Sequence, residues 1–456
     1  RMPHIYVLIF GIIMACMLLT WILPAGEFDR APNAAGRNVV VPGTFHTIEQ
    51  TPVGLFQGIQ AVYKGMVDAA GVVFFVFISF ASIQIIIASG AFNGLVAWML
   101  KIFKGKARVA IIPIFITIIG AASSTIGLFE ETLPFIPIFI GIAIAMGYDG
   151  LVGMAIVAIG AGLGYSGAAI NPFTVGVAQG IAEIAPMSGT GFRVICHLAM
   201  ITVASLYVMR YALKIQADPS KSLVADTDFS RFAMDQESLE GHAFGIREKL
   251  VLLTLALGIV VIVYGSKVHH WYFQELCAVF IIMAIVASAI MGWGPNVIGE
   301  KMAAGFSDIA MACMMIGLAR GILVVLQQGH IIDTIVYGFS VPLAGLPSWL
   351  AGEAMLVMQT LLNFLIPSGS GQAATSMPIM APLSDLLGIS RQVAVLAFQF
   401  GDGISNILWP TAFAPVICGI AGIKINTWWK WFVPCFLLIM ATQMVLIAIA
   451  IGMGWS

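Results

Sequence analysis

The sequence predicts an all-α polytopic membrane protein made of two inverted repeats, each with a re-entrant hairpin and a broken transmembrane helix. The 456 residues are 60% hydrophobic and only 9% charged, whereas soluble domains carry roughly 25% charged residues. Apolar runs recur along the chain, and several of them are interrupted by polar, glycine-rich residues. The two most strongly interrupted regions, 123–171 and 367–410, share one design and lie in different halves of the chain.

The first half begins with an unbroken apolar run. A spanning helix needs about 20 apolar residues, and residues 5–23 fit this length. We predict a retained span there rather than a signal peptide, because no convincing small-residue cleavage site follows. Residues 26–52 are polar and predict an external loop, and 71–89 form the next span. The basic cluster at 101–108 then predicts a cytoplasmic segment by the positive-inside rule.

Residues 109–147 are too long for one helix, and their middle is broken by the polar stretch 123–132. Irregular backbone at membrane depth is tolerated only where protein or a water-filled cavity satisfies it. We therefore predict a re-entrant hairpin whose tip lies near the middle of the membrane. The run 151–184 predicts one crossing that is broken at 164–172, and 194–213 predicts the span that returns the chain to the cytoplasm.

Residues 216–248 are the longest polar stretch and predict a cytoplasmic linker between two halves. Three further spans are predicted at 250–264, 273–291 and 305–326, the first two joined by a short outer loop, 266–271. A second hairpin is predicted at 348–387, with its tip at 367–375. A second broken crossing follows at 394–423 and is interrupted at 401–410. A last span covers 431–453. The second half thus repeats the order of hairpin, broken helix and final span.

The hairpins are predicted to enter from opposite sides of the membrane, so the halves are predicted to be inverted copies. Each half opens a span with a similar tetrapeptide, 65–68 or 305–308, and centres its broken helix on an asparagine, Asn171 or Asn406. Interrupted segments at matching places in two halves are typical of secondary transporters, whose binding site lies at the repeat interface.

Hydroxyl, amide and backbone groups at the tips and breaks are the first candidate ligands. Half-helix N-termini suit carboxylates, whereas unwound carbonyls with side-chain oxygens suit Na⁺. The residues of this kind predicted to bind substrate are Ser123, Ser124, Thr125, Asn171, Ser368, Gly369, Ser370, Thr375 and Asn406. The residues predicted to surround a coupling Na⁺ are Ser124, Gly167, Asn171, Ser368, Ser405 and Asn406. Proton coupling stays open, no other cofactor is expected, and any single hydroxyl has helix packing as its alternative role.

Acidic residues are the second set of candidates. Glu130 and Glu131 fall at the first tip and Asp402 in the second break, and all three are predicted to belong to the site. The tips and breaks contain no Lys or Arg, and the nearest arginines, Arg193, Arg320 and Arg391, are predicted to lie near the membrane edges. Carboxylates at bilayer depth need a cation or a proton, so the pattern predicts an acidic site for a cationic group or a coupling ion. The alternative is that one glutamate caps the second arm of the hairpin.

Several functional classes are disfavoured by the same sequence. The net charge of −1 provides no basic surface for nucleic acid. Six cysteines lie in apolar runs without a CxxC pair, so neither a disulfide framework nor a zinc site is indicated. An enzyme or an ATP-driven pump is disfavoured because no nucleophile or metal spacing and no Walker motif is found. A channel stays a weaker alternative, since it does not require paired breaks.

Three motifs resemble a known family. Residues 127–132 (GLFEET), 164–173 (GYSGAAINPF) and 367–373 (PSGSGQA) resemble the YfcC-type membrane proteins. These are grouped with the anaerobic C4-dicarboxylate carriers and basic amino acid antiporters within the ion-transporter superfamily. The resemblance covers nearly the whole chain and implies a homodimer whose scaffold carries a transport domain that moves as an elevator. The tips here read SST (123–125) and SGS (368–370), whereas the sodium–dicarboxylate branch of the superfamily has Ser-Asn-Thr.

These observations predict five segments and one functional class. The segments are scaffold 1–107 and 249–347, transport domain 108–215 and 348–456, and the linker 216–248. The expected function is a secondary transporter in the bacterial inner membrane for a small amino acid or carboxylate metabolite. A basic amino acid, exchanged or cation-coupled, is favoured by the acidic residues. A Na⁺- or H⁺-coupled C4-dicarboxylate carrier is the alternative.

Overall fold

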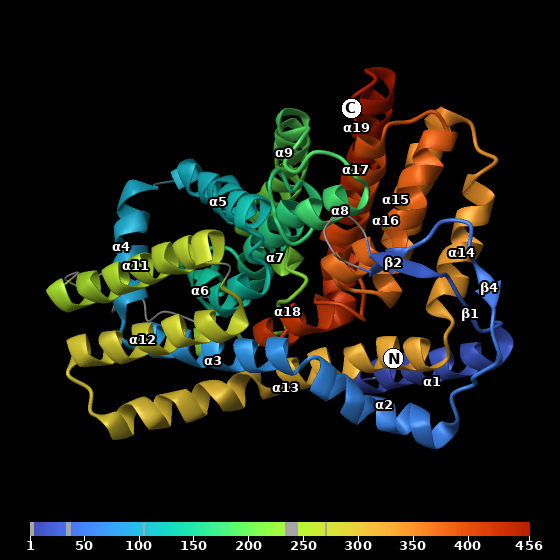
Figure 1. The fold of residues 1–456 in the computed structure, drawn as a ribbon. Coiled ribbons are helices and arrows are strands. Elements are labelled where there is room, and N and C mark those ends of the chain that lie inside the picture. The colour runs from blue at the N-terminus through green and yellow to red at the C-terminus, as the bar shows by residue number, and fades with distance from the viewer. Residues whose placement is uncertain (1–3, 33–37, 104, 233–244, 270) are drawn as a thin grey trace.

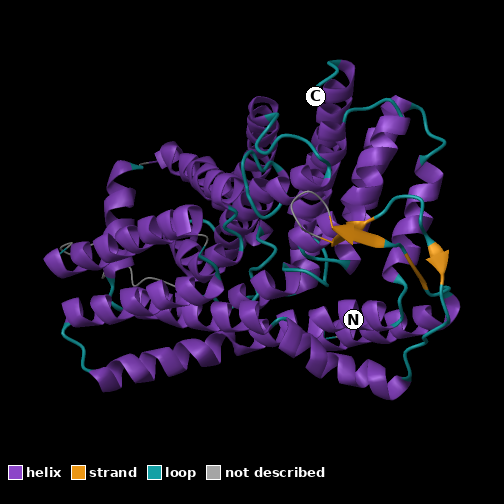
Figure 2. Cartoon of the chain, viewed as in Figure 1, coloured by secondary structure: helices purple, strands orange, loops and turns teal. Residues whose placement is uncertain are grey.

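The computed structural model describes residues 4–32, 38–103, 105–232, 245–269 and 271–456, and these are mostly helical (Figures 1 and 2). Eight helices in these ranges are long and apolar enough to cross a membrane. The all-α prediction needs one correction, because the predicted outer loop holds four short strands. These are β1 (Gly26–Glu27), β2 (Arg30–Pro32), β3 (Asn38–Val40) and β4 (His46–Thr47), and β1 pairs with β4 and β2 with β3, both antiparallel.

The first helix group occupies the lower and left-hand part of Figure 1. It consists of α1 (Ile5–Ile22), α2 (Leu55–Asp68), α3 (Ala70–Ala88), α11 (Ile246–His269), α12 (Phe273–Met291) and α13 (Pro295–Gln328). The long α13 packs along α1, α2 and α3, and α12 packs between α3 and α11. At Gly65 the backbones of α2 and α13 approach so closely that a Cβ would overlap the backbone of Gly317 and Gly321.

The second helix group contains the hairpins and broken helices. Its members are α5 (Ile111–Ile126), η2 (Glu130–Phe135), α6 (Ile136–Ala145), α7 (Gly150–Ser166), α8 (Val175–Ile181), α9 (Thr190–Ala217), α15 (Ser348–Leu365), α16 (Gly369–Leu386), α17 (Arg391–Gly403), η5 (Ile404–Ile407), α18 (Ala414–Ala421) and α19 (Ile425–Gly452). Both arms of each hairpin pack on the helix that follows, α5 and α6 on α7, and α15 and α16 on α17. All of α7 except Tyr165 and all of α17 except Arg391 is buried, so these two helices form the centre of the group.

Each hairpin turn and each break overlaps the interval predicted for it, although both breaks continue three residues or fewer beyond it, to residues 174 and 413. The first hairpin turns between α5 and η2, and the second between α15 and α16. The first broken helix is interrupted between α7 and α8, and the second at η5 and the residues before α18. The membrane sides from which the hairpins enter stay a prediction.

Several helices differ in extent from the prediction. Helix α2 was not predicted, α13 begins at Pro295 rather than at residue 305, and α11 continues to His269, into the predicted outer loop. Hydropathy detects only the apolar part of a helix, and these extensions carry polar residues such as Gln57, Glu300 and Lys301. The remaining helical segments are α4 (Ala91–Ile102), α14 (Ile332–Leu343), η1 (Gly105–Ala110), η3 (Pro219–Lys221) and η4 (Ser230–Phe232). Residues 233–244 of the predicted linker lie outside the described ranges.

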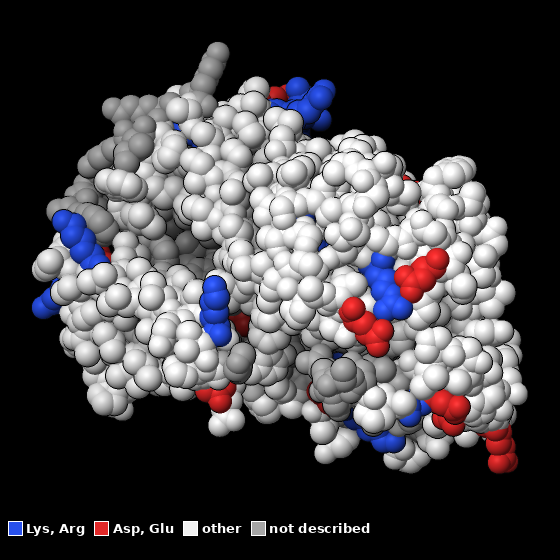
Figure 3. Space-filling model, turned by 45° about the horizontal axis from the view of Figure 1, so that its top comes forward, with Lys and Arg blue, Asp and Glu red and all other residues white. Residues whose placement is uncertain are grey.

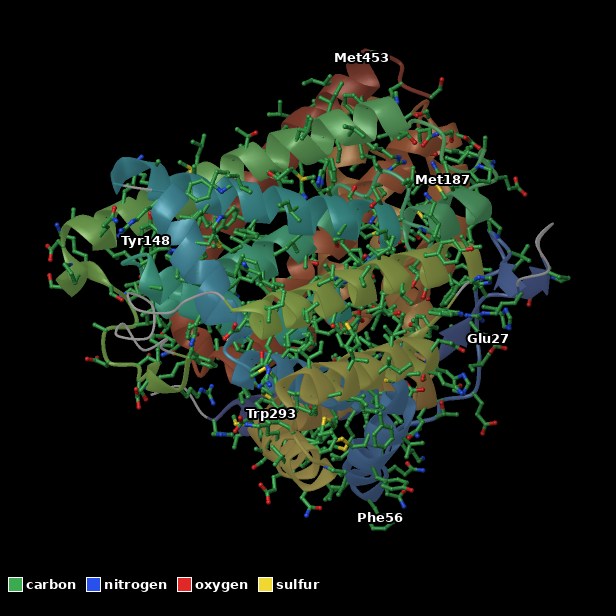
Figure 4. The ribbon with its side chains drawn as sticks, turned by 90° about the vertical axis from the view of Figure 1, so that its left-hand side faces the viewer. Glu27, Phe56, Tyr148, Met187, Trp293 and Met453 are labelled. Atoms are coloured by element: carbon green, nitrogen blue, oxygen red, sulfur yellow. The ribbon has the colours of Figure 1, made fainter. Side chains whose placement is uncertain are left out.

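The outer surface is suited to lipid. Charged residues are sparse on the face in Figure 3 and gather in a few clusters. Large apolar side chains are exposed instead, among them Phe56, Met187 and Met453, which lie at the periphery of Figure 4. Contiguous apolar surface on this scale marks contact with a membrane or a partner.

Candidate functional site

The first hairpin tip is a tight turn that exposes two carboxylates. Gly127 ends α5 with φ +83°, a left-handed conformation that favours glycine, and a Cβ there would lie 2.7 Å from Oδ1 of Asn171. The backbone amide of Phe129 donates to Oε2 of Glu131 (3.1 Å), and the Thr132 hydroxyl donates to the carbonyl of Phe129 (2.6 Å). Glu131 therefore stabilises the turn, whereas the Glu130 carboxylate has a hydrogen bond to its own backbone and none assigned to another residue in the described part of the chain.

The second hairpin tip is the N-terminus of α16. Ser368 is the N-cap residue, and its hydroxyl accepts from the amide of Gly371 (3.4 Å). The first turn of a helix presents free N–H groups and a partial positive charge. Because Gly369 and Ser370 follow the cap, this turn offers backbone donors with little side-chain obstruction.

Both tips line a single cavity of about 410 Å³ that lies between the two helix groups. Residues from the second group that line it include Gly127, Glu130, Glu131, Tyr165, Phe173, Ser368, Gly369, Ser370, Asn406 and Phe413. Residues from the first group and its connecting loops include Asp68, Val72, Ser266, Trp271, Tyr272, Phe273, Ile316 and Arg320. The segment η2, which carries both glutamates, packs against α3, and α18 packs against α13, so the cavity lies where the groups meet.

The cavity holds one cation that was not predicted to line the site. Arg320 lines the cavity, where its guanidinium forms an ion pair with Asp68. Its place there was not predicted because position along an apolar helix does not reveal which residues face an internal cavity, and its expected position near a membrane edge stays a prediction. Among the described lining residues, Arg320 is the one cation, against Asp68, Glu130 and Glu131. With Asp68 paired to Arg320, the two glutamates stay without a cationic partner.

The other two arginines are engaged with side chains outside the cavity. Arg193 is only 1% exposed and donates to Oε1 of Gln392 (3.0 Å). Arg391 forms ion pairs with Glu183 and Asp385. Neither arginine lines the cavity, so neither neutralises the glutamates.

Six predicted site residues line the cavity: Glu130, Glu131, Ser368, Gly369, Ser370 and Asn406. Six others do not: Ser123, Ser124, Thr125, Asn171, Thr375 and Asp402. Thr125 and Thr375 donate to carbonyls one turn earlier in their own helices, at 2.7 and 2.9 Å. The structure therefore brings the two tips together but leaves several of the predicted hydroxyls outside the cavity.

The buried serines of the first hairpin hold helices together. The Ser123 hydroxyl donates to the carbonyl of Ala161 (2.9 Å). The Ser124 hydroxyl donates to the carbonyl of Gly167 (2.9 Å) and accepts from the amide of Ala169 (3.0 Å). Ser124 thus fixes the start of the first break against α5, which is the packing role that hydroxyls often have in membrane helices.

The predicted sodium ligands are largely engaged with the protein. Oδ1 of Asn171 accepts from the amide of Phe173 (2.9 Å), while its Nδ2, a donor, has no partner. The Ser405 hydroxyl donates to the carbonyl of Gly401 (2.5 Å), and Nδ2 of Asn406 donates to that of Asp402 (2.6 Å). Sodium at this set stays a prediction. The described residues include no group of three or more His, Cys, Asp and Glu side chains placed to hold a metal ion.

Aromatic lining residues were not predicted. Phe129 contacts both Tyr165 and Phe413, with ring centroids 5.1 and 4.7 Å apart, and Phe173 approaches Tyr272 at 6.0 Å. Trp271 falls at the end of the predicted outer loop and Phe273 at the start of the predicted span, so the sequence alone did not indicate that the run Trp271–Phe273 lines the cavity. Together with Asp68 and Arg320 it lines the cavity from the side of the first helix group.

Comparison with known proteins assigns the chain to a family. The family model of the C4-dicarboxylate anaerobic carriers, DcuC, matches residues 2–452. The chain belongs to the C4-dicarboxylate anaerobic carrier family. This confirms the resemblance seen in the motifs, and with the eight apolar helices it identifies a multi-pass protein of the bacterial plasma membrane. The family is one of carriers, which are generally not enzymes.

Two relatives align with the chain from end to end. A Haemophilus influenzae Rd protein without an assigned function is 29% identical, over 96% of this chain and 95% of its own length. YfcC of Escherichia coli K12, provisionally named a basic amino acid antiporter, is 28% identical, over 94% of this chain and 92% of its own length. This carrier family member thus has relatives of similar overall length.

Two solved transporters are distantly similar. The YdaH transporter of Alcanivorax borkumensis has 16% identity and a TM-score of 0.46, with 99% of each chain covered. MtrF of Neisseria gonorrhoeae, from a class of antimetabolite efflux pumps, has 17% identity and a TM-score of 0.45, with 99% of this chain and 96% of that chain covered.

Proposed function

We propose that this carrier is a secondary transporter for a basic amino acid, moved by exchange or by cation coupling. The observation that carries the proposal is the pair of glutamates, Glu130 and Glu131, which face the cavity between the tips without a cationic partner. A cationic substrate nitrogen there would form charge-assisted hydrogen bonds, which are roughly twice as strong as neutral ones. The provisional name of YfcC agrees with this substrate class.

The second hairpin tip suits the other end of an amino acid. The first turn of α16 lines the same cavity as the glutamates, at Ser368, Gly369 and Ser370. Helix N-termini bind carboxylates through free N–H groups and the helix dipole. One cavity therefore offers an acidic wall for a cationic group and a positive helix end for an α-carboxylate. The aromatic lining fits the aliphatic part between them, and about 410 Å³ is ample for one such molecule.

The place of the cavity between the two helix groups supports a proposal for alternating access. We propose that the two halves are inverted repeats and that the second helix group, from segments 108–215 and 348–456, is the transport domain. The first helix group, from 1–107 and 249–347, would be the scaffold, and two copies would associate through it as a homodimer. Both hairpin tips and both broken helices belong to the second group. Movement of that group along the scaffold would carry the substrate from one side to the other, as an elevator does.

A C4-dicarboxylate is the second candidate substrate, and Arg320 is the observation that favours it. Arg320 lines the cavity on the scaffold side and pairs with Asp68, whose side chain is half exposed. A substrate carboxylate that displaced Asp68 would bind Arg320, while its second carboxylate met the first turn of α16. The name of the family is in agreement with this alternative.

Ligand-induced thermal stabilisation separates the two candidates. Purified protein in lipid nanodiscs would be heated with arginine, lysine or ornithine, and separately with succinate or malate, each with and without Na⁺. A ligand that binds the folded state raises its unfolding temperature by mass action. We expect a basic amino acid to raise it, with uncharged citrulline as the matched control that does not. Stabilisation by succinate or malate alone would contradict the proposed substrate and favour the dicarboxylate.

A further inference from the structure

Arg193 is a charged side chain that is buried at the positive end of a long helix. It is the fourth residue of α9, whose N-cap residue is Gly189, and it is only 1% exposed. The N-cap makes no side-chain hydrogen bond to the first turn, and the first turn contains no acidic residue. Because a helix N-terminus carries a partial positive charge, a buried cation there is unfavourable unless an anion accompanies it.

The contacts of Arg193 do not neutralise its charge. Nη2 donates to Oε1 of Gln392 (3.0 Å), which belongs to a neutral amide, while Nε and Nη1 are buried without a hydrogen-bond partner. None of the ion pairs among the described residues includes Arg193, although Arg391, the residue before Gln392, pairs with both Glu183 and Asp385. Buried charges are normally paired, because an uncompensated one costs several kcal/mol. One full charge and two donor nitrogens therefore stay unmatched.

The guanidinium is directed back toward the start of α9. Helix side chains are inclined toward the N-terminus of their helix. The Arg193 guanidinium lies 5.3 Å from the centre of the Trp455 ring, and a Cβ on Gly189 would overlap the same ring. Gln392, which accepts from Arg193, donates in turn to Oγ of Ser188 (2.5 Å). The guanidinium therefore lies beside the two residues that precede the uncapped first turn.

The chemistry of this place is that of a site for a small monovalent anion. Free amides at a helix N-terminus bind anions, and the guanidinium supplies one positive charge with N–H donors. An anion that reaches the buried Arg193 must lose most of its water, which costs a divalent anion far more than a halide. We infer that Arg193 and the first-turn amides of α9 bind a chloride ion.

The bound chloride would join segments that are far apart in the sequence. Arg193 belongs to α9 and Gln392 to the first turn of α17. The Ser390 hydroxyl, just before α17, donates to the carbonyl of Trp455, which follows α19 (2.5 Å). None of these residues lines the substrate cavity. Chloride is thus a structural ligand of the second helix group, and the inference is independent of which substrate is carried.

The test is thermal unfolding of the full chain in nanodiscs, in NaCl and in sodium gluconate at equal ionic strength and pH 7.5. Gluconate is too large to enter a buried site, so it serves as the anion that does not bind. We expect chloride to raise the unfolding midpoint of wild type by about 2–4 °C. Arg193→Met should unfold at the same temperature in both salts. In gluconate, its midpoint should equal or exceed that of wild type, because the uncompensated buried charge is gone.

Two more variants sharpen the assignment. Arg193→Lys keeps the charge but not the planar set of donors, so it should keep a chloride response and need at least tenfold more chloride for half of it. Arg391→Gln is the matched control, since Arg391 lies at the same end of α17 and its charge is already met by Glu183 and Asp385. It should unfold at a lower temperature in both salts and respond to chloride as wild type does.

Three outcomes would overturn the inference. The first is a wild type with the same midpoint in chloride and in gluconate. The second is a full chloride response in Arg193→Met, which would place the effect elsewhere. The third is an Arg193→Met midpoint below that of wild type in gluconate, which would show that Arg193 stabilises the fold without an anion.

Discussion

Replacing both Glu130 and Glu131 with glutamine is expected to reduce the uptake of a basic amino acid at least a hundredfold. Each glutamate would lose a charge-assisted hydrogen bond to the substrate, worth about 1.5–3 kcal/mol, or roughly a tenfold to hundredfold change in affinity. The measurement is uptake of radiolabelled arginine into proteoliposomes, with substrate concentration varied to saturation. Saturation also separates a carrier from a channel.

The two single variants separate an effect on substrate binding from an effect on the stability of the fold. Glu131 accepts from the amide of Phe129, so Glu131→Gln should lower the unfolding temperature as well as uptake. Glu130 has no assigned hydrogen bond to another residue, so Glu130→Gln should lower uptake alone. Glu49→Gln, in the exposed outer loop, is the control and should leave uptake unchanged. Undiminished uptake by the double variant would contradict the proposal that Glu130 and Glu131 bind the cationic group of the substrate.

Gly403→Ala is expected to have the largest effect on the fold. Gly403 ends α17 where the second broken helix meets the first, and a Cβ there would overlap the backbone nitrogen and the Cα of Ser166. The same junction is held by the Ser166 hydroxyl, which accepts from the amide of Ile404 (2.7 Å). No rotamer can relieve a clash with backbone, so the two helices must separate. Overpacking of this kind costs typically about 1–3 kcal/mol.

The expected result is a lower unfolding temperature in nanodiscs and a more than tenfold loss of arginine uptake. The matched control is Gly180→Ala in α8, beside the first break, where an added methyl group would meet no atom within 4 Å. Alanine favours helix by about 0.8–1 kcal/mol over glycine, so this control should be neutral or stabilising. Equal stability of Gly403→Ala and wild type would show that the broken helices do not meet as described.

The architecture was predictable because a break in a membrane helix changes the local amino-acid composition. Runs such as 123–132 and 401–410 place Gly, Ser, Pro and acids inside apolar sequence, which a continuous lipid-facing helix does not tolerate. Both hairpin turns and both breaks overlap the predicted intervals for this reason. Helix ends were less predictable, because α2 and the start of α13 carry polar residues that hydropathy excludes.

The cavity wall was not predictable, because it depends on which faces meet across the fold. Arg320 looks like a residue at the end of a span, and only the packing of α13 against α2 places it beside Asp68. Ser124 has the composition of a ligand, yet its hydroxyl bonds to residues about forty positions away in the first break. Composition predicts which residues can bind, and tertiary contacts decide which of them are free to do so.

The most direct test of the account is a cryo-EM structure of the protein in nanodiscs with the stabilising ligand bound. We predict ligand density between the two tips, with its cationic end at Glu130 and Glu131 and its carboxylate at the first turn of α16. Ligand density elsewhere, or tips that lie on opposite faces of the membrane, would contradict it.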